Sequence, residues 1–106
     1  MFAVSRKVDE QIQIGDDLLV GPTDIDPKIV RLIARGREMG GPNDGAPFTR
    51  DADLGIGGEM RLGDHVVITV IDIRGDQVRL AVQVPKQVMV QRKEVADAQR
   101  REHGEI

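Results

Sequence analysis

The chain has 106 residues, a net charge of −3 and no cysteine, which excludes disulfide bonds and thiolate chemistry. Hydrophobic residues make up 40% of it, yet it has two Phe and no Trp or Tyr, so we expect one small domain with a thin aliphatic core. No apolar run is long enough for a signal peptide or a membrane span, and we therefore expect a cytoplasmic protein without a membrane partner.

Two short strands are predicted at the start of the chain. Residues 2–7 alternate in polarity, as the residues of a half-buried strand do, and the alternation returns over residues 10–14 after a bend. Gly15 ends or kinks this second strand, and residues 18–20 can extend it before Gly21 breaks the pattern.

A helix is predicted over residues 27–39. Asp26 suits the N-cap and Pro27 the first helical position, while Gly40 stops the helix. The apolar side chains at helical spacing are Ile29, Val30, Leu32 and Ile33. We expect this stripe to pack on a sheet or across a dimer rather than to line a ligand groove.

Residues 40–58 are rich in Gly, Pro, Asp and Asn and lack periodicity, which predicts a flexible loop. Asp44, Asp51 and Asp53 lie in this segment, and carboxylates of this kind can bind cations. They do not have the spacing of an EF-hand or its closing bidentate Glu, so we predict no metal site.

The most persistent alternation in the chain covers residues 65–94. Strands are predicted over residues 66–70 and 78–84, each with one face toward a core and one toward solvent. The connection at Gly75-Asp76 predicts a tight hairpin, because glycine readily adopts the positive φ that such turns require.

Pro85 ends the second of these strands, because proline cannot donate to a strand ladder. A third strand is predicted over residues 88–92. The helix formers of residues 93–101 then predict a C-terminal helix, with two arginines near its end where they suit the helix dipole.

We predict no enzymatic activity and no cofactor. His65 and His103 have no obvious partner, and two scattered histidines without cysteine do not make a zinc site. The glycine-rich run at residues 55–58 lacks the Lys-Ser/Thr pair of a phosphate loop.

Charge is unevenly distributed along the chain. Residues 16–63 carry −3 and residues 94–106 carry −2, whereas the strand-rich remainder carries +2. This mild excess of cations suits contact with RNA phosphates, and solvated faces of an ordinary sheet are the alternative. The segment 83–88 exposes main-chain groups that can bind splayed bases, although the chain lacks Trp and Tyr for base stacking.

Two stretches carry a family resemblance. The first is MFAVSRKVDEQIQI with Gly15-Asp16, and the second is residues 70–94 with Gly75, Pro85-Lys86 and Arg92. Together they resemble the carbon storage regulator (CsrA/Rsm) family of bacterial RNA-binding translational regulators. The resemblance implies a mainly β fold: a small antiparallel five-stranded sheet unit that forms an intertwined homodimer, the first strand of one chain running beside the last strand of the other.

An internal echo suggests where extra sequence lies. The triad Ile14-Gly15-Asp16 recurs as Leu62-Gly63-Asp64, 48 residues later. We interpret this as a single domain over residues 1–106 with an insert at about 16–63, which would hold the helix at about 27–39 and the loop at about 40–58. A branch of the family is similar in carrying a helix at this junction.

The resemblance also implies the site. Positions that match the family's RNA contacts are Val4, Arg6, Val90 and Arg92, with Lys7 and Lys86 as secondary phosphate contacts. For Arg92 a salt bridge with Glu94 is the alternative, and for Arg6 a salt bridge with Glu10. The sequence departs from the family pattern at Val4, Asp9, Ala81 and Gln91.

The expected function is that of an RNA-binding post-transcriptional regulator. It would recognise GGA-containing hairpin loops in mRNA leaders or small regulatory RNAs and alter translation or mRNA stability. The alternative is a protein-interaction module on the same scaffold, with weak or lost RNA binding and a protein antagonist or partner regulator. Salt dependence separates the two, since RNA binding weakens steeply as salt rises.

Overall fold

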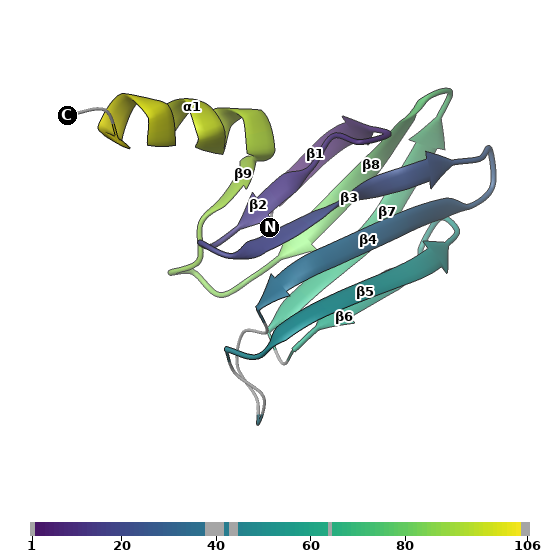
Figure 1. The fold of residues 1–106 in the computed structure, drawn as a ribbon. Coiled ribbons are helices and arrows are strands. Elements are labelled where there is room, and N and C mark those ends of the chain that lie inside the picture. The colour runs from purple at the N-terminus through teal and green to yellow at the C-terminus, as the bar shows by residue number, and fades with distance from the viewer. Residues whose placement is uncertain (1, 38–41, 43–44, 64, 105–106) are drawn as a thin grey trace.

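The structure is a computed structural model that describes residues 2–37, 42, 45–63 and 65–104. Within these residues the chain forms nine strands and one helix (Figure 1). Their bounds are β1 Phe2–Lys7, β2 Ile12–Ile14, β3 Leu18–Ile25, β4 Val30–Arg37, β5 Pro47–Leu54, β6 Glu59–Leu62, β7 Val66–Arg74, β8 Gln77–Gln83, β9 Val90–Arg92 and α1 Lys93–Gly104.

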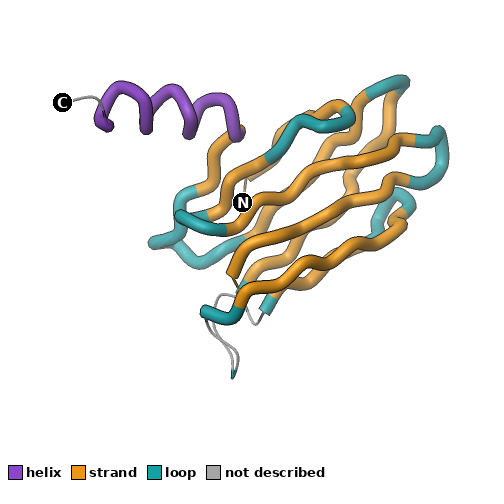
Figure 2. Tube along the Cα trace, viewed as in Figure 1, coloured by secondary structure: helices purple, strands orange, loops and turns teal. Residues whose placement is uncertain are grey.

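The strands form two antiparallel sheets that face each other. One sheet has four strands in the order β1-β8-β7-β6, and the other has five in the order β5-β4-β3-β2-β9 (Figure 2). Aliphatic side chains from both sheets are fully buried between them, among them Ile12, Leu32, Ile68 and Leu80. The predicted mainly β fold with a five-stranded antiparallel sheet is therefore confirmed, and a second sheet packs against it.

The predicted helix over residues 27–39 is wrong where the structure describes this segment, because β4 takes its place. Val30, Leu32 and Ala34 are all 0% exposed and alternate with exposed arginines, so the burial repeats every two residues. The short apolar run satisfied a helical spacing equally well, and its β-branched side chains favour a strand. The stripe faces the core between the two sheets.

The Asp-Pro pair expected to begin that helix instead forms the hairpin between β3 and β4. The main-chain N–H of Asp26 donates to the carbonyl of Ile29 at 2.9 Å, and the Lys28 N–H donates to Asp26 Oδ1 at 3.2 Å. Proline also suits this turn, because its fixed φ is that of the first central position. An N-cap signal and a turn signal share these residue types.

The predicted loop over residues 40–58 is wrong over much of its length. β5 covers residues 47–54 and pairs with β4 along its whole length. A turn at Gly55–Gly58 follows, in which the Gly58 N–H donates to the Gly55 carbonyl at 2.9 Å. Residues 38–41 and 43–44 of the expected loop lie outside the described residues. Because β3, β4 and β5 belong to one sheet and β6 to the other, segment 16–63 is part of the core.

The predicted strands of the second half are confirmed. β7 and β8 are joined by a two-residue hairpin in which Gly75 has a φ of 58°. β8 ends at Gln83, before Pro85, and α1 follows β9 directly. Near the start of the chain, residues 18–20 do not extend β2: Gly15, with a φ of 63°, lies in a turn, and β3 begins at Leu18.

The strand exchange expected between two chains takes place within one chain in this structure. β1 pairs with β8, and β2 pairs with β9. The first strand and the last strand thus both find partners without a second copy. The homodimer itself stays a prediction.

Candidate functional site

β1 and β9 are edge strands of the two sheets, and the side chains predicted to bind RNA lie on their core-facing sides. Val90 pairs with Ile14, and Arg92 pairs with Ile12. Directly opposed residues of an antiparallel pair point to the same face, and both isoleucines are 0% exposed in the core. Val90 and Arg92 therefore leave β9 on its inner face, where Val90 packs against the core.

β1 presents its predicted residues in the same way. Val4 packs against the core and Arg6 is only 4% exposed, whereas the intervening Ser5 and the following Lys7 are exposed. The alternation predicted for β1 therefore places Val4 and Arg6 inward. We call the set Val4, Arg6, Val90 and Arg92 the β1/β9 margin.

A single carbonyl joins the ends of the two strands. The oxygen of Gln11 accepts a hydrogen bond from Arg6 Nη1 at 3.2 Å and another from the main-chain N–H of Lys93 at 2.9 Å. Lys93 directly follows Arg92 in the chain. The structure thus brings Arg6 and Arg92 to one end of the molecule, as predicted, but from the same chain.

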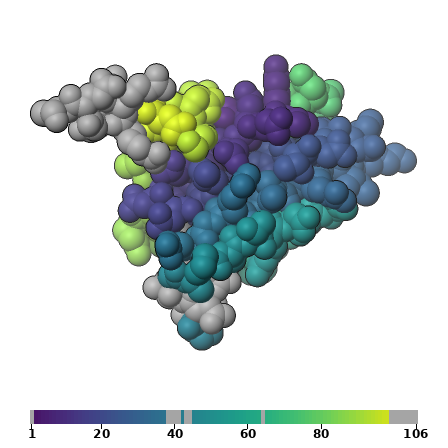
Figure 3. Space-filling view, viewed as in Figure 1, coloured from purple at the N-terminus to yellow at the C-terminus, as the bar shows by residue number. Residues whose placement is uncertain are grey.

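Arg6 holds the helix against β1. Its Nη1 and Nη2 donate to the two carboxylate oxygens of Glu94 at 2.8 and 3.1 Å, and its Nε donates to the Ser5 carbonyl at 2.9 Å. In Figure 3 the purple surface of β1 accordingly lies against the yellow surface of α1. The salt bridge considered from the sequence, with Glu10, is longer at 4.0 Å. The guanidinium of Arg6 is therefore already engaged in tertiary structure.

The bidentate contact with Arg6 lowers the pKa of the Glu94 carboxyl from 4.5 to about 2. Hydrogen bonding by the guanidinium is the main cause, and the nearby positive charge of Arg92 contributes to the same direction. At neutral pH the salt bridge is therefore fully charged.

Because the pKa of Glu94 is lower in the folded chain, its contribution to stability is full above pH 4.5 and is lost as the pH falls toward about 2. The carboxylate is 56% exposed, so solvent screening limits the contribution to about 1 kcal/mol. Urea unfolding of the Glu94→Gln variant measures it: the deficit relative to wild type should shrink over this pH range. Glu10→Gln is the control and should show a smaller deficit. Parallel pH curves for wild type and Glu94→Gln would contradict the assignment.

The other predicted cations are more available. Arg92 and Lys86 are exposed, and among the described residues neither forms an ion pair. Lys7 is 51% exposed, and its Nζ lies 3.7 Å from Asp76 Oδ2, a contact between two solvated groups. Arg92 and Lys86 are therefore free to meet a polyanion, and Lys7 can do so by exchanging an exposed partner.

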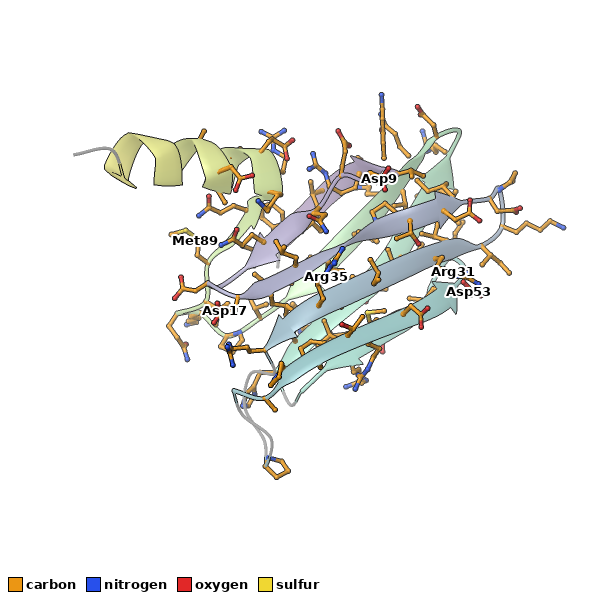
Figure 4. The ribbon with its side chains drawn as sticks, viewed as in Figure 1. Asp9, Asp17, Arg31, Arg35, Asp53 and Met89 are labelled. Carbon is orange, nitrogen blue, oxygen red and sulfur yellow. The ribbon has the colours of Figure 1, made fainter. Side chains whose placement is uncertain are left out.

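The segment before β9 is held by main-chain hydrogen bonds. The Val88 N–H donates to the Pro85 carbonyl at 3.0 Å, and the Gly15 N–H donates to the Met89 carbonyl at 2.8 Å. Met89 itself is 63% exposed and lies beside β9 (Figure 4). The segment predicted to offer main-chain groups to RNA is thus fixed at its start and at its end.

Gln91 is a candidate that the sequence interpretation noted only as a departure from the family pattern. Its side-chain oxygen is buried, and among the described residues it has no hydrogen-bond partner. An unpaired buried acceptor costs about 1–3 kcal/mol, and a ligand donor would remove that cost. The signal in the sequence was a polar amide between Val90 and Arg92.

The described residues contain no cluster of three or more side chains suited to a metal ion. Asp53 instead pairs with Arg31, whose Nε lies 2.8 Å from its Oδ1 (Figure 4). In the same part of the chain, no helix is both long and apolar enough to cross a membrane.

Comparison with known proteins adds a family to this geometry. Residues 56–101 match the model of the global regulator protein family, CsrA. Over 42 residues, 40% of this chain and 54% of the relative, the chain is 43% identical to the translational regulator CsrA of Desulfitobacterium hafniense strain Y51. It is 38% identical to that of Syntrophomonas wolfei over 47 residues, 44% of this chain and 62% of the relative. It is 45% identical to that of Pseudarthrobacter chlorophenolicus over 42 residues.

The alignments thus span about half to three-fifths of the relatives' own length. No solved structure matches. The fold and the β1/β9 margin define a two-sheet β protein with a partly cationic strand edge. The resemblance to the CsrA family is confirmed over residues 56–101, which contain β7, β8 and β9 and the predicted residues Lys86, Val90 and Arg92. Val4, Arg6 and Lys7 lie outside the matched segment.

Proposed function

We propose that this protein is an RNA-binding post-transcriptional regulator that recognises GGA-containing hairpin loops in mRNA leaders or small regulatory RNAs, without catalysis. The relatives of residues 56–101 carry the name translational regulator. The observation that carries the proposal is the β1/β9 margin, where the exposed Arg92 forms no ion pair among the described residues.

The chemistry of the margin suits a single-stranded loop. The planar guanidinium of Arg92 can donate two parallel hydrogen bonds to a guanine edge or to a phosphate. Val4 and Val90 supply an apolar floor, while Lys7 and Lys86 neutralise phosphates. With no Trp or Tyr in the chain, base edges rather than stacked rings would provide specificity.

Arg6 acts in this proposal by position rather than as a free cation. Its salt bridge with Glu94 fixes the end of β1 beside the start of α1. An RNA phosphate or base can still approach the outer nitrogen atoms of the pair, and the direct RNA contact predicted for Arg6 stays a prediction. The expected homodimer and a protein antagonist likewise stay predictions.

Fluorescence anisotropy with two hairpins tests the proposal. A hairpin with GGA in its loop should bind at least about tenfold more tightly than one with CCA, because two guanine edges are lost in the control. Affinity for the GGA hairpin should fall steeply as salt rises, since phosphate contacts release counterions. Equal affinity for both hairpins, or no binding to either, would overturn the proposal.

A further inference from the structure

The two sheets repeat one pattern of strand pairing at a spacing of 48 residues. In one sheet Ile12 is opposite Val20 where β2 meets β3. In the other sheet Met60 is opposite Ile68 where β6 meets β7. Each residue of the second pair follows its counterpart by 48 positions, and the same holds along the full length of β2.

The irregular features repeat at the same spacing. The pairing of β3 with β4 shifts between Pro22 and Asp24, and that of β7 with β8 shifts between Val70 and Asp72. Such bulges occur at defined positions and are specific features of a fold. Their repetition at one spacing indicates that β2–β4 and β6–β8 are two copies of one three-stranded unit.

The turns before these units also correspond. Asp9, with a φ of 70°, donates its N–H to the Pro22 carbonyl at 3.0 Å. Gly57, with a φ of 88°, donates its N–H to the Val70 carbonyl at 2.7 Å. Asp9 is the one non-glycine residue with positive φ among those described, and its counterpart is a glycine.

The first strands of the two copies are exchanged. β1 pairs with β8 of the second copy, with Arg6 opposite Val78. β5 pairs with β4 of the first copy, with Leu54 opposite Val30. Leu54 follows Arg6 by 48 positions, and Val30 precedes Val78 by 48. The two copies are therefore related by an approximate two-fold exchange within one chain.

We infer that this chain is a fused pair of one β unit, residues 2–37 and residues 50–85, which works as a single chain and keeps only one of two equivalent RNA sites. The second part of this inference rests on the proposed function. The retained site is the β1/β9 margin, and the lost one is its counterpart at β5 and β6.

The lost site has exchanged its cations for neutral residues. By the spacing of 48 residues, Ala52 corresponds to Val4, Leu54 to Arg6 and Gly55 to Lys7. In sequence, the residues 48 positions before Lys86, Val90 and Arg92 are Glu38, Pro42 and Asp44. Without these cations, the second margin cannot neutralise phosphates as the first does.

One arginine of β5 lies at the second margin, and it is engaged. The Nη1 of Arg50 donates to the main-chain carbonyl of Arg61 on β6. Arg61 corresponds to Gln13 of β2, which is opposite Gln91 of β9. At the second margin an arginine side chain thus caps a strand edge that at the first margin is covered by β9. Among the described residues no strand pairs with that edge of β6.

The first test needs no RNA. Light scattering of the purified chain at micromolar concentration should give the mass of one chain, 11.7 kDa. Each exchanged strand has its partner in the same chain, so dilution should not change the circular dichroism spectrum. A mass of two chains that falls only on unfolding would overturn the fused pair, whatever the RNA result.

The second test counts RNA sites. Calorimetric titration with the GGA hairpin should give one RNA per chain. Arg92→Ala should weaken binding at least fivefold, whereas Arg50→Ala, which removes an arginine from the second margin, should change it less than twofold. Two RNAs per chain, or equal losses in both variants, would overturn the single site. A one-chain mass without any RNA binding would refute the proposed function and support the fused pair.

Discussion

Replacing Arg92 with alanine is expected to weaken binding of a GGA hairpin by about 5- to 150-fold, the equivalent of about 1–3 kcal/mol. Arg92 is exposed on the inner face of β9 and forms no ion pair among the described residues, so its donors are free for RNA. Because no folded-state partner is lost, the midpoint of thermal unfolding should stay where it is in the wild type. Gel-shift titration and a thermal melt measure the two quantities.

Arg35→Ala is the matched control for this variant. Arg35 is likewise an exposed arginine, and it lies on β4, in the middle of the five-stranded sheet (Figure 4). Its removal changes net charge by the same amount, so any general electrostatic loss appears in both variants. We expect less than a twofold loss for Arg35→Ala. An unchanged affinity in Arg92→Ala, or equal losses in both variants, would reject the role of Arg92.

The largest loss of stability is expected for Gly36→Ala, about 3 kcal/mol or more, enough to unfold a small domain. Gly36 has a φ of 146°, a conformation that side chains rarely adopt. An added Cβ would lie 1.9 Å from the carbonyl oxygen of Asp17, which is main chain and cannot rotate away. The end of β4 would have to separate from the turn before β3.

Gly75→Ala separates the effect of the clash from that of the backbone conformation. Gly75 has a φ of 58°, and an added Cβ would meet no heavy atom within 4 Å. We expect a cost of about 1 kcal/mol for the left-handed conformation alone. Urea unfolding monitored by circular dichroism compares the two. Equal stability losses in both variants would show that β4 and the Asp17 turn are not packed as described.

The sequence predicted best where burial alternates without interruption. The hairpin of β7 and β8 was predicted with its turn, because Gly75 lies between two runs of period two. The helix after β9 was also predicted. These elements are specified by local pattern, so distant contacts were not needed to infer them.

β4 was missed because local pattern alone does not separate a short apolar run in a strand from one in a helix. Asp26 and Pro27 reinforced the wrong choice, since an N-cap and a hairpin turn favour the same residue types. What decides in favour of a strand is pairing with β3 on one side and β5 on the other. That pairing is tertiary.

The duplication left a signal that was only partly interpreted. The triad at Ile14 and Leu62 was taken as the boundary of an insert, but the echo continues at the same spacing. Asp24-Ile25 recurs as Asp72-Ile73, and Val30-Arg31-Leu32 recurs as Val78-Arg79-Leu80. Following the spacing further would have indicated two copies of one unit and hence a strand at residues 30–37.

The candidate site was predicted by position but not by environment. Resemblance selected Arg6 and Arg92 together, and the structure brings them to one end through the Gln11 carbonyl. The sequence did not indicate that Arg6 is buried with Glu94, because that contact joins residues 88 positions apart. Of the alternatives considered, Arg92 does not pair with Glu94, since the carboxylate is held by Arg6.

Native mass spectrometry of the protein mixed with the GGA hairpin and, separately, with the CCA hairpin tests the account most directly. The account predicts a complex of one 11.7 kDa chain with one GGA hairpin and little complex with CCA. Two chains bound to the GGA hairpin, two hairpins on one chain, or equal complex formation with both RNAs would contradict it.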